Sequence, residues 1–115
     1  MISHKLRLKV FKRDGERCVA CARFTMLTIQ HRVSKGMGGS KLFDTIPYLL
    51  TLCVSCNGRL ESDSKFAELG RTNGWKLDRN QNPPIDPTTV PVNYYGQWYL
   101  LNENGTKEKI KWQQD

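Results

Sequence analysis

The sequence predicts one small α+β domain, and three observations lead to this class. The chain has 115 residues, which suffices for a single modest hydrophobic core. Helical periodicity and strand-like alternation occur in separate segments, as an α+β fold requires. The four cysteines form two short pairs, Cys18-Val19-Ala20-Cys21 and Cys53-Val54-Ser55-Cys56. Such pairs often cross-link a domain whose core is small.

The first half of the chain predicts a helix followed by two strands. Residues 3–13 (SHKLRLKVFKR) carry apolar side chains at helical spacing, with Ser3 as the N-cap and Asp14-Gly15 as the stop signal. Residues 26–31 (MLTIQH) alternate apolar and polar side chains, which is typical of a half-buried strand. Residues 47–53 (PYLLTLC) are mainly apolar and predict a second strand that ends at the second cysteine pair.

The second half predicts a helix, an irregular segment and a hairpin. Residues 57–70 (NGRLESDSKFAELG) have the pattern of a single amphipathic helix. Residues 78–91 contain four prolines, which favour an extended strap over regular structure. Residues 97–101 (QWYLL) and 107–112 (KEKIKW) predict two strands of a β-hairpin, with Asn104-Gly105 in the turn.

The spacing of the cysteines predicts a structural zinc site. Each Cys-x-x-Cys pair supplies two thiolates from one turn, and the 31 residues between the pairs allow the chain to return and complete a tetrahedron. Four thiolates leave no open coordination position, so this zinc would stabilise the fold without catalysing a reaction. A redox-active pair and plain buried thiols are the alternatives. The expected domain organisation is a zinc-bound module over residues 1–78, with residues 79–115 as a strap and hairpin packed on it.

The distribution of charge predicts a polyanionic partner. The formal net charge is +7, from 18 basic and 11 acidic residues. Residues 1–60 hold eleven of the basic residues and three of the acidic ones, a formal +8, whereas residues 61–115 are close to neutral. The excess favours nucleic acid, and a solvated basic face is the alternative. No stretch has the length and apolarity of a membrane span or a signal peptide, so we expect a cytoplasmic protein that does not bind membranes.

One histidine stands between the first predicted strand and a basic, glycine-rich loop. His31 is followed by RVSKGMGGSK, whose glycines permit close approach of the backbone to a ligand and whose cations suit phosphate. Imidazole titrates near neutral pH, so His31 is a candidate general base, although an isolated histidine is often structural. The candidate phosphate contacts are Arg32, Lys35, Lys41 and Arg59, each with a solvated side chain as the alternative.

Four segments together resemble the HNH endonucleases, whose ββα-metal motif is often carried between two zinc knuckles. They are RDGERCVAC, LTIQHRVSKGMGGS, LLTLCVSCN and AELGRTNGWKL. In particular, the chain resembles the small HNH proteins encoded by bacteriophages of actinobacteria, over about residues 10–78 and more thinly to about residue 105. The resemblance implies a ββα-metal fold stabilised by zinc at Cys18, Cys21, Cys53 and Cys56. It also implies a bacterial host cell as the location.

The resemblance also implies roles for individual residues. His31 matches the motif histidine that activates water, and Asn57 matches the last catalytic position of the motif. Gln30 stands where many members have an Asp or His metal ligand, and Tyr48 stands where they have the middle asparagine. A divalent cation such as Mg²⁺ would be held by the amide oxygens of Gln30 and Asn57 together with phosphate oxygens. A helix cap is the alternative role for Asn57.

Two functions follow from the resemblance. The first is metal-dependent hydrolysis of DNA phosphodiester bonds, with His31 as the general base and mostly backbone contacts to the DNA. The second is a protein on the same frame in which the changes at Gln30, Tyr48 and Asn57 have weakened or removed catalysis. Such a protein would bind DNA or a protein partner, and the resemblance implies the phage packaging machinery as one such partner.

Overall fold

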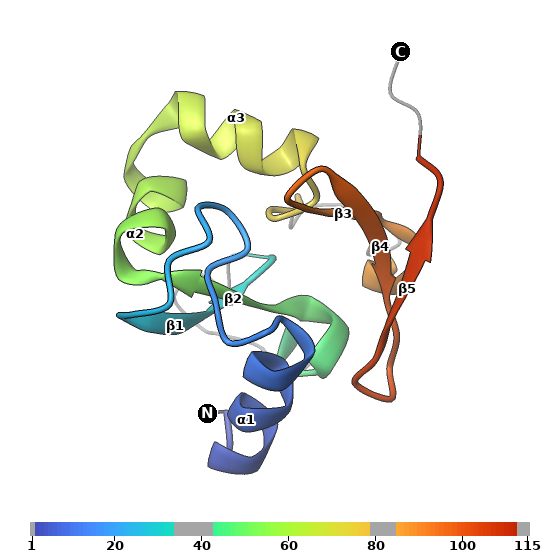
Figure 1. Ribbon diagram of the computed structural model, residues 1–115. Coiled ribbons are helices and arrows are strands. Elements are labelled where there is room, and N and C mark those ends of the chain that lie inside the picture. Colours follow the sequence, from blue (N-terminus) through green and yellow to red (C-terminus); the bar gives the residue numbers. More distant parts are fainter. Residues whose placement is uncertain (1, 34–42, 79–84, 113–115) are drawn as a thin grey trace.

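The computed structural model describes residues 2–33, 43–78 and 85–112. Over these ranges the chain forms three α-helices and two small antiparallel sheets, so the predicted α+β class is confirmed (Figure 1). The elements are α1 (His4–Arg13), β1 (Leu27–His31), η2 (Ile46–Tyr48, a 3-10 turn), β2 (Leu49–Cys53), α2 (Val54–Ser62), α3 (Ser64–Thr72), η3 (Pro87–Thr89, a 3-10 turn), β3 (Val92–Tyr94), β4 (Gln97–Leu101) and β5 (Lys107–Ile110). None of the described helices has the length and apolarity needed to cross a membrane.

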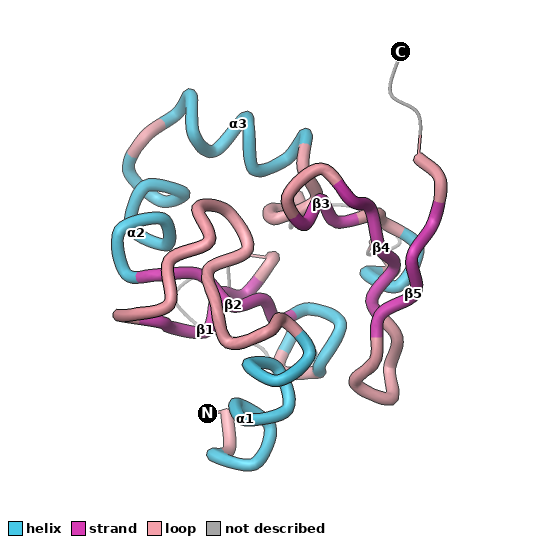
Figure 2. Tube along the Cα trace, viewed as in Figure 1, coloured by secondary structure: helices cyan, strands magenta, loops and turns pink. Residues whose placement is uncertain are grey.

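The β1–β2 sheet lies in the middle of the molecule, with α2 and α3 to one side and the β3–β4–β5 sheet to the other (Figure 2). Its antiparallel register pairs Leu27 with Cys53 at one end and His31 with Leu49 at the other. All five residues of β2 are buried. Helix α1 covers part of this strand, because Val10 packs in one cluster with Leu49. Cys53 and His31 therefore lie at opposite ends of the β1–β2 sheet.

Helix α1 begins and ends where the sequence predicts. The hydroxyl of Ser3 accepts a hydrogen bond from the backbone NH of Leu6 at 3.1 Å, which satisfies one of the free donors of the first turn. Asp14 is the C-cap, and the following Gly15 has a φ of +73°, a left-handed conformation that glycine adopts at little cost.

The single helix predicted over residues 57–70 is wrong. The structure has two helices, because α2 begins already at Val54 and ends before Asp63. The Asp63 carboxylate accepts hydrogen bonds from the backbone NH groups of Lys65 and Phe66 and so serves as the N-cap of α3. A carboxylate that binds the NH groups two and three residues further on favours the start of a new helix over continuation of the old one. The helix is therefore interrupted at Asp63.

The predicted C-terminal hairpin is confirmed as β4 and β5, although the second strand ends at Ile110. A third strand, β3, was not predicted, because three residues are too few to give an alternating pattern. Val92 of β3 pairs with Tyr99 of β4. The proline-rich strap is irregular over its described part apart from η3, and residues 79–84 lie outside the described residues.

The main hydrophobic core joins residues from both sides of position 78. Leu50 and Leu52 of β2 pack in one cluster with Val92 and Leu101 of the C-terminal sheet. Gly74 brings the two parts into close backbone contact, because a Cβ at this position would lie 2.0 Å from the carbonyl oxygen of Pro91. The C-terminal segment is thus part of the same core as the β1–β2 sheet.

A buried polar cluster ties α1 to both sheets. The guanidinium of Arg13 forms two hydrogen bonds to the carboxylate of Asp14, at 2.8 and 3.0 Å. The same carboxylate accepts from the backbone NH of Thr51 in β2 and from the hydroxyl of Tyr94 in β3. Both charged side chains are almost fully buried, so each group needs the partners that the other supplies.

Candidate metal centre and histidine site

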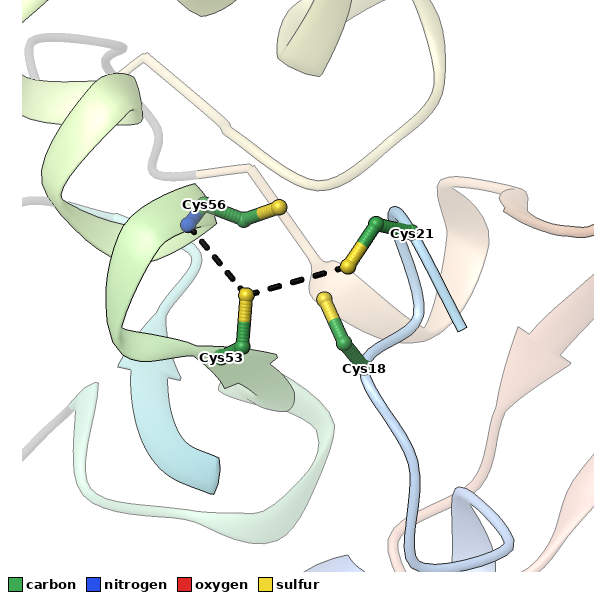
Figure 3. Close-up of side chains that lie close together, drawn as sticks. All are labelled: Cys18, Cys21, Cys53 and Cys56. Atoms are coloured by element: carbon green, nitrogen blue, oxygen red, sulfur yellow. Dashed lines mark hydrogen bonds between the residues drawn. The ribbon is translucent and has the colours of Figure 1, made fainter. Parts of the chain in front are cut away.

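The four cysteines converge on one point (Figure 3). Cys18 and Cys21 lie in the loop after α1, Cys53 ends β2, and Cys56 lies in the first turn of α2. All four Sγ atoms lie within 4.8 Å of one another, and those of Cys21 and Cys53 are 3.7 Å apart. Sulfur atoms bound tetrahedrally at about 2.3 Å from zinc would be about 3.8 Å apart. The four cysteines, none of them in a disulfide, can therefore bind a metal ion such as zinc.

Local backbone structure brings each pair to this point. The NH of Ala22 donates to the carbonyl oxygen of Cys18 at 2.8 Å, which closes the first turn, and the NH of Val19 donates to Thr51 of β2 at 3.0 Å. Cys53 is the N-cap of α2, and its sulfur accepts from the NH of Cys56 at 3.4 Å. The second pair is thus fixed by the strand-to-helix junction and the first by its attachment to β2.

The thiols differ in their electrostatic environment. Burial would raise the pKa of Cys53, but hydrogen bonds from the NH and thiol of Cys56 and from the other thiols outweigh this effect and lower it to about 7. Burial raises the pKa of Cys18 and, more strongly, that of Cys56. A bound cation would favour the thiolate form at all four positions, and soft thiolate ligands suit zinc.

At the opposite end of β1, His31 forms a pair with Asp44. The Nε2 atom of His31 lies 2.7 Å from a carboxylate oxygen of Asp44, and the two side chains are 22% and 13% exposed. Asp44 belongs to the segment just before η2 and was not predicted as a site residue. One signal in the sequence was available, since Asp44 is the sole acidic residue between the two cysteine pairs. Its contact with His31 depends on how the chain returns to β2.

The two predicted amide ligands lie on the α2 side of the β1–β2 sheet. Asn57 donates from its side-chain nitrogen to the hydroxyl of Thr28 at 2.9 Å, and thereby links α2 to β1. The alternative role of Asn57 as a helix cap is wrong, because Cys53 is the N-cap and Asn57 lies one turn inside the helix. Gln30 is 4% exposed and, by strand alternation, shares the face of Thr28 and not that of His31.

The predicted phosphate contact of Arg32 is wrong. This side chain is fully buried, and its guanidinium donates to four backbone carbonyl groups. The acceptors are Gly74, Pro47, Pro87 and Val90, at 2.9 to 3.2 Å. Burial lowers the pKa of Arg32 to about 10, which still leaves the guanidinium charged at neutral pH. Arg32 therefore joins the strap to the β1–β2 sheet and cannot reach a phosphate without partial unfolding.

The other predicted site residues have varied surroundings. Arg59 is 53% exposed, lies over the ring of Phe66 at 4.1 Å and is 3.7 Å from the carboxylate of Asp63. Lys35 and Lys41 lie outside the described residues. Tyr48, which occupies the position of the middle asparagine, is buried, and its hydroxyl donates to the carbonyl oxygen of Ile85 at 3.0 Å.

The cysteine centre is the one group of three or more His, Cys, Asp or Glu side chains in the described residues that is close enough to hold an ion. Comparison of the chain with protein-family models, with curated proteins and with solved structures found no match. The function is therefore inferred from the residues of this chain.

Proposed function

We propose that the protein is a metal-dependent, HNH-type DNA endonuclease with a structural zinc ion at the four cysteines. The observation that carries this proposal is the His31–Asp44 pair at the end of β1, 2.7 Å apart and partly exposed. The order of elements also supports it, because two antiparallel strands lead directly into α2 and the cysteine centre joins them.

The His31–Asp44 pair suits general base catalysis. An ionised Asp44 accepts a hydrogen bond from Nε2–H of His31, and this tautomer leaves the lone pair of Nδ1 free. Nδ1 can then take a proton from a water molecule as its oxygen attacks the phosphorus atom. The bond from phosphorus to the 3′ oxygen breaks, and the departing oxygen takes up a proton from solvent. Asp44 acts here as a positioning residue, since it orients the imidazole and selects its tautomer.

Asp44 also supplies a negative charge that the motif lacks at position 30. The HNH resemblance expects a charged or imidazole ligand there, and Gln30 is neutral and buried. Gln30 and Asn57 lie on the face of β1 opposite to His31, so a divalent cation that stabilises the negative charge developing on the phosphate would have to be held on the His31 side, beside Asp44. The Asp44 carboxylate favours the presence of a cation on this part of the molecule.

A second candidate function is DNA or protein binding without catalysis. The observation that favours it is the state of the two amide residues, because Gln30 is almost fully buried and the Asn57 side chain is bonded to Thr28. The basic first half of the chain would still attract a polyanion. A phage packaging protein as the partner follows from the resemblance alone.

Plasmid cleavage separates the two functions. We would incubate supercoiled plasmid at low salt with Mg²⁺, Mn²⁺, Ni²⁺ or no added metal, and measure binding to the same DNA by gel shift. His31→Ala should lower the cleavage rate by a factor of about 10² to 10⁴ while leaving DNA binding unchanged. His4→Ala, which removes the other, exposed histidine, is the matched control and should retain full activity.

Asp44 needs its own variants. Asp44→Asn should lower kcat with little change in KM or in the melting temperature, and Asp44→Glu should restore part of the rate. A purely structural role would instead lower the melting temperature of both variants. Binding without cleavage under every metal condition would replace the nuclease proposal with the second function.

A further inference from the structure

A pocket of about 370 Å³ lies between α1 and the turn that joins β4 to β5, away from the cysteines. In Figure 1, helix α1 and the turn between β4 and β5 both lie in the lower part of the molecule. One wall is formed by Lys9, Lys12 and Arg13 of α1, and the other by Asn104, Gly105, Thr106 and Lys107. From these residues, and on the premise of the proposed function that the ligand is nucleic acid, we propose that this pocket binds a backbone phosphate.

The charge of the lining favours an anion. Lys9, Lys12 and Lys107 contribute three ammonium groups, and none of the described residues that line the pocket carries a carboxylate. The positive charge of Arg13 is balanced by the negative carboxylate of Asp14, with which the guanidinium forms two hydrogen bonds. The C-terminal end of α1 contributes about half a negative charge, which is too small to cancel three cations. Lysine ammonium groups are effective point-charge donors to phosphate.

One of the three cations is held in place before any ligand arrives. The ammonium of Lys107 donates to the backbone carbonyl oxygen of Arg13 at 2.7 Å and lies 4.6 Å from the ring centre of Tyr94. Partial burial lowers the pKa of Lys107. The attraction of Asp14 offsets part of this effect, and a partly desolvated cation gains more from a bound anion than a fully solvated one does.

The opposite wall is also organised in advance. The Asn104 side chain accepts hydrogen bonds from both the backbone NH and the hydroxyl of Thr106. Gly105 has a φ of +91°, and a Cβ at this position would lie 3.2 Å from the side chain of Ile46. The turn therefore rests on the segment that follows Asp44, and its shape does not depend on a ligand.

The pocket is also connected to the histidine site. The guanidinium of Arg13 donates to the carbonyl oxygen of Ile46 at 3.0 Å and to that of Leu49 at 2.6 Å. Leu49 is the residue that pairs with His31 across the β1–β2 sheet. Arg13 thus connects a wall of the pocket to the strand that pairs with His31.

The test is a comparison of two double variants that remove the same amount of charge. Lys9→Gln with Lys12→Gln changes the pocket, whereas Arg7→Gln with Lys65→Gln removes two exposed cations that do not line it. Binding of a fluorescent 20-base-pair duplex is measured by anisotropy at several salt concentrations without added divalent cation, in the His31→Ala background. The pocket variant should bind about tenfold more weakly, and the slope of log K against log salt should fall by about 2.

Two outcomes would overturn the assignment. Equal losses of affinity and slope in both double variants would mean that only overall charge matters. In a second measurement, inorganic phosphate is titrated while the amide signals of Gly105 and Thr106 are followed by NMR. Shifts with phosphate but none with duplex DNA would assign the pocket to a small phosphorylated molecule instead. These experiments measure binding and not cleavage. They therefore test the phosphate pocket even if the protein proves not to be a nuclease.

Discussion

The two ends of the β1–β2 sheet are built in different ways. At the end where Leu27 pairs with Cys53, four thiols from two local turns converge within 4.8 Å. At the end where His31 pairs with Leu49, single side chains make the contacts, with partners from several segments and without paired ligands from one turn. His31 meets Asp44 thirteen residues away, and the carbonyl partners of Arg32 lie between 15 and 58 residues away.

The two ends of the sheet therefore have different roles: the cysteine end can cross-link two segments, and the histidine end holds individual side chains in place. At the cysteine end one bound ion would hold two segments together, and each ligand pair is formed by its own turn. The histidine end is held by buried arginines whose donors are shared among backbone carbonyl groups of several elements. Loss of a cysteine should therefore affect the whole fold, whereas changes at the histidine end should have graded effects.

The largest effect is expected for Cys53→Ala. Structural zinc in small domains contributes about 10–16 kcal/mol of apparent binding free energy, which is as large as the total stability of a typical domain. We expect loss of the cooperative thermal transition in far-UV circular dichroism, together with loss of zinc measured by mass spectrometry of the metal. Ser55→Ala, an exposed position within the same Cys-x-x-Cys pair, is the matched control and should keep both. A wild-type melt for the cysteine variant would refute the structural metal.

The next largest effect is expected for Arg32→Met. The substitution leaves four carbonyl groups without their donor and should cost about 3–5 kcal/mol in the free energy of unfolding, measured with urea. Arg71→Met removes an exposed ion pair with Asp78 and should cost less than about 1 kcal/mol. A stable Arg32→Met variant with weakened DNA binding would restore Arg32 as a phosphate contact.

A smaller and pH-dependent effect is expected for Tyr94→Phe, which removes the hydroxyl that donates to Asp14. The loss should be about 1.5–3 kcal/mol at pH 7, because the acceptor is charged. Burial, and then Asp14, raise the pKa of Tyr94 well above that of an unfolded tyrosine. Its contribution is therefore complete below about pH 10 and is lost as the pH rises further.

Urea unfolding of wild type and Tyr94→Phe at pH 7, 9 and 10.5 tests whether the stabilisation by Tyr94 is lost at high pH. The difference in unfolding free energy between the two proteins should narrow at the highest pH. Tyr99→Phe, on the neighbouring strand β4, is the matched control. A difference that stays constant with pH would show that the Tyr94 hydroxyl is not coupled to Asp14 in this way.

The smallest effect on stability is expected for His31→Ala. The pair with Asp44 is partly exposed, so its removal should change the free energy of unfolding by about 1 kcal/mol or less. Thermal denaturation beside the His4→Ala control measures this change. A loss comparable to that of Arg32→Met would make His31 a structural residue and would remove the main support for catalysis.

The sequence by itself determined the features that depend on short-range patterns. The spacing of the cysteines predicted a metal-binding group, and the Ser3 cap with the Asp14-Gly15 stop predicted α1. Alternation and the Asn104-Gly105 turn predicted the strands of the hairpin. Each Cys-x-x-Cys pair, cap and turn lies within a few residues, so the local pattern contains the interaction; only the meeting of the two cysteine pairs spans a longer distance in the chain.

Only the tertiary structure decided which polar groups meet across the fold. The sequence placed Arg32 in a basic loop and predicted a phosphate contact, yet its guanidinium is buried among four carbonyl groups from three separate segments. Asp44 could be counted as the one acid between the cysteine pairs, but its contact with His31 required the chain to return to β2. Burial of a charge depends on donors and acceptors that lie far apart in the chain, and only the packed core brings them together.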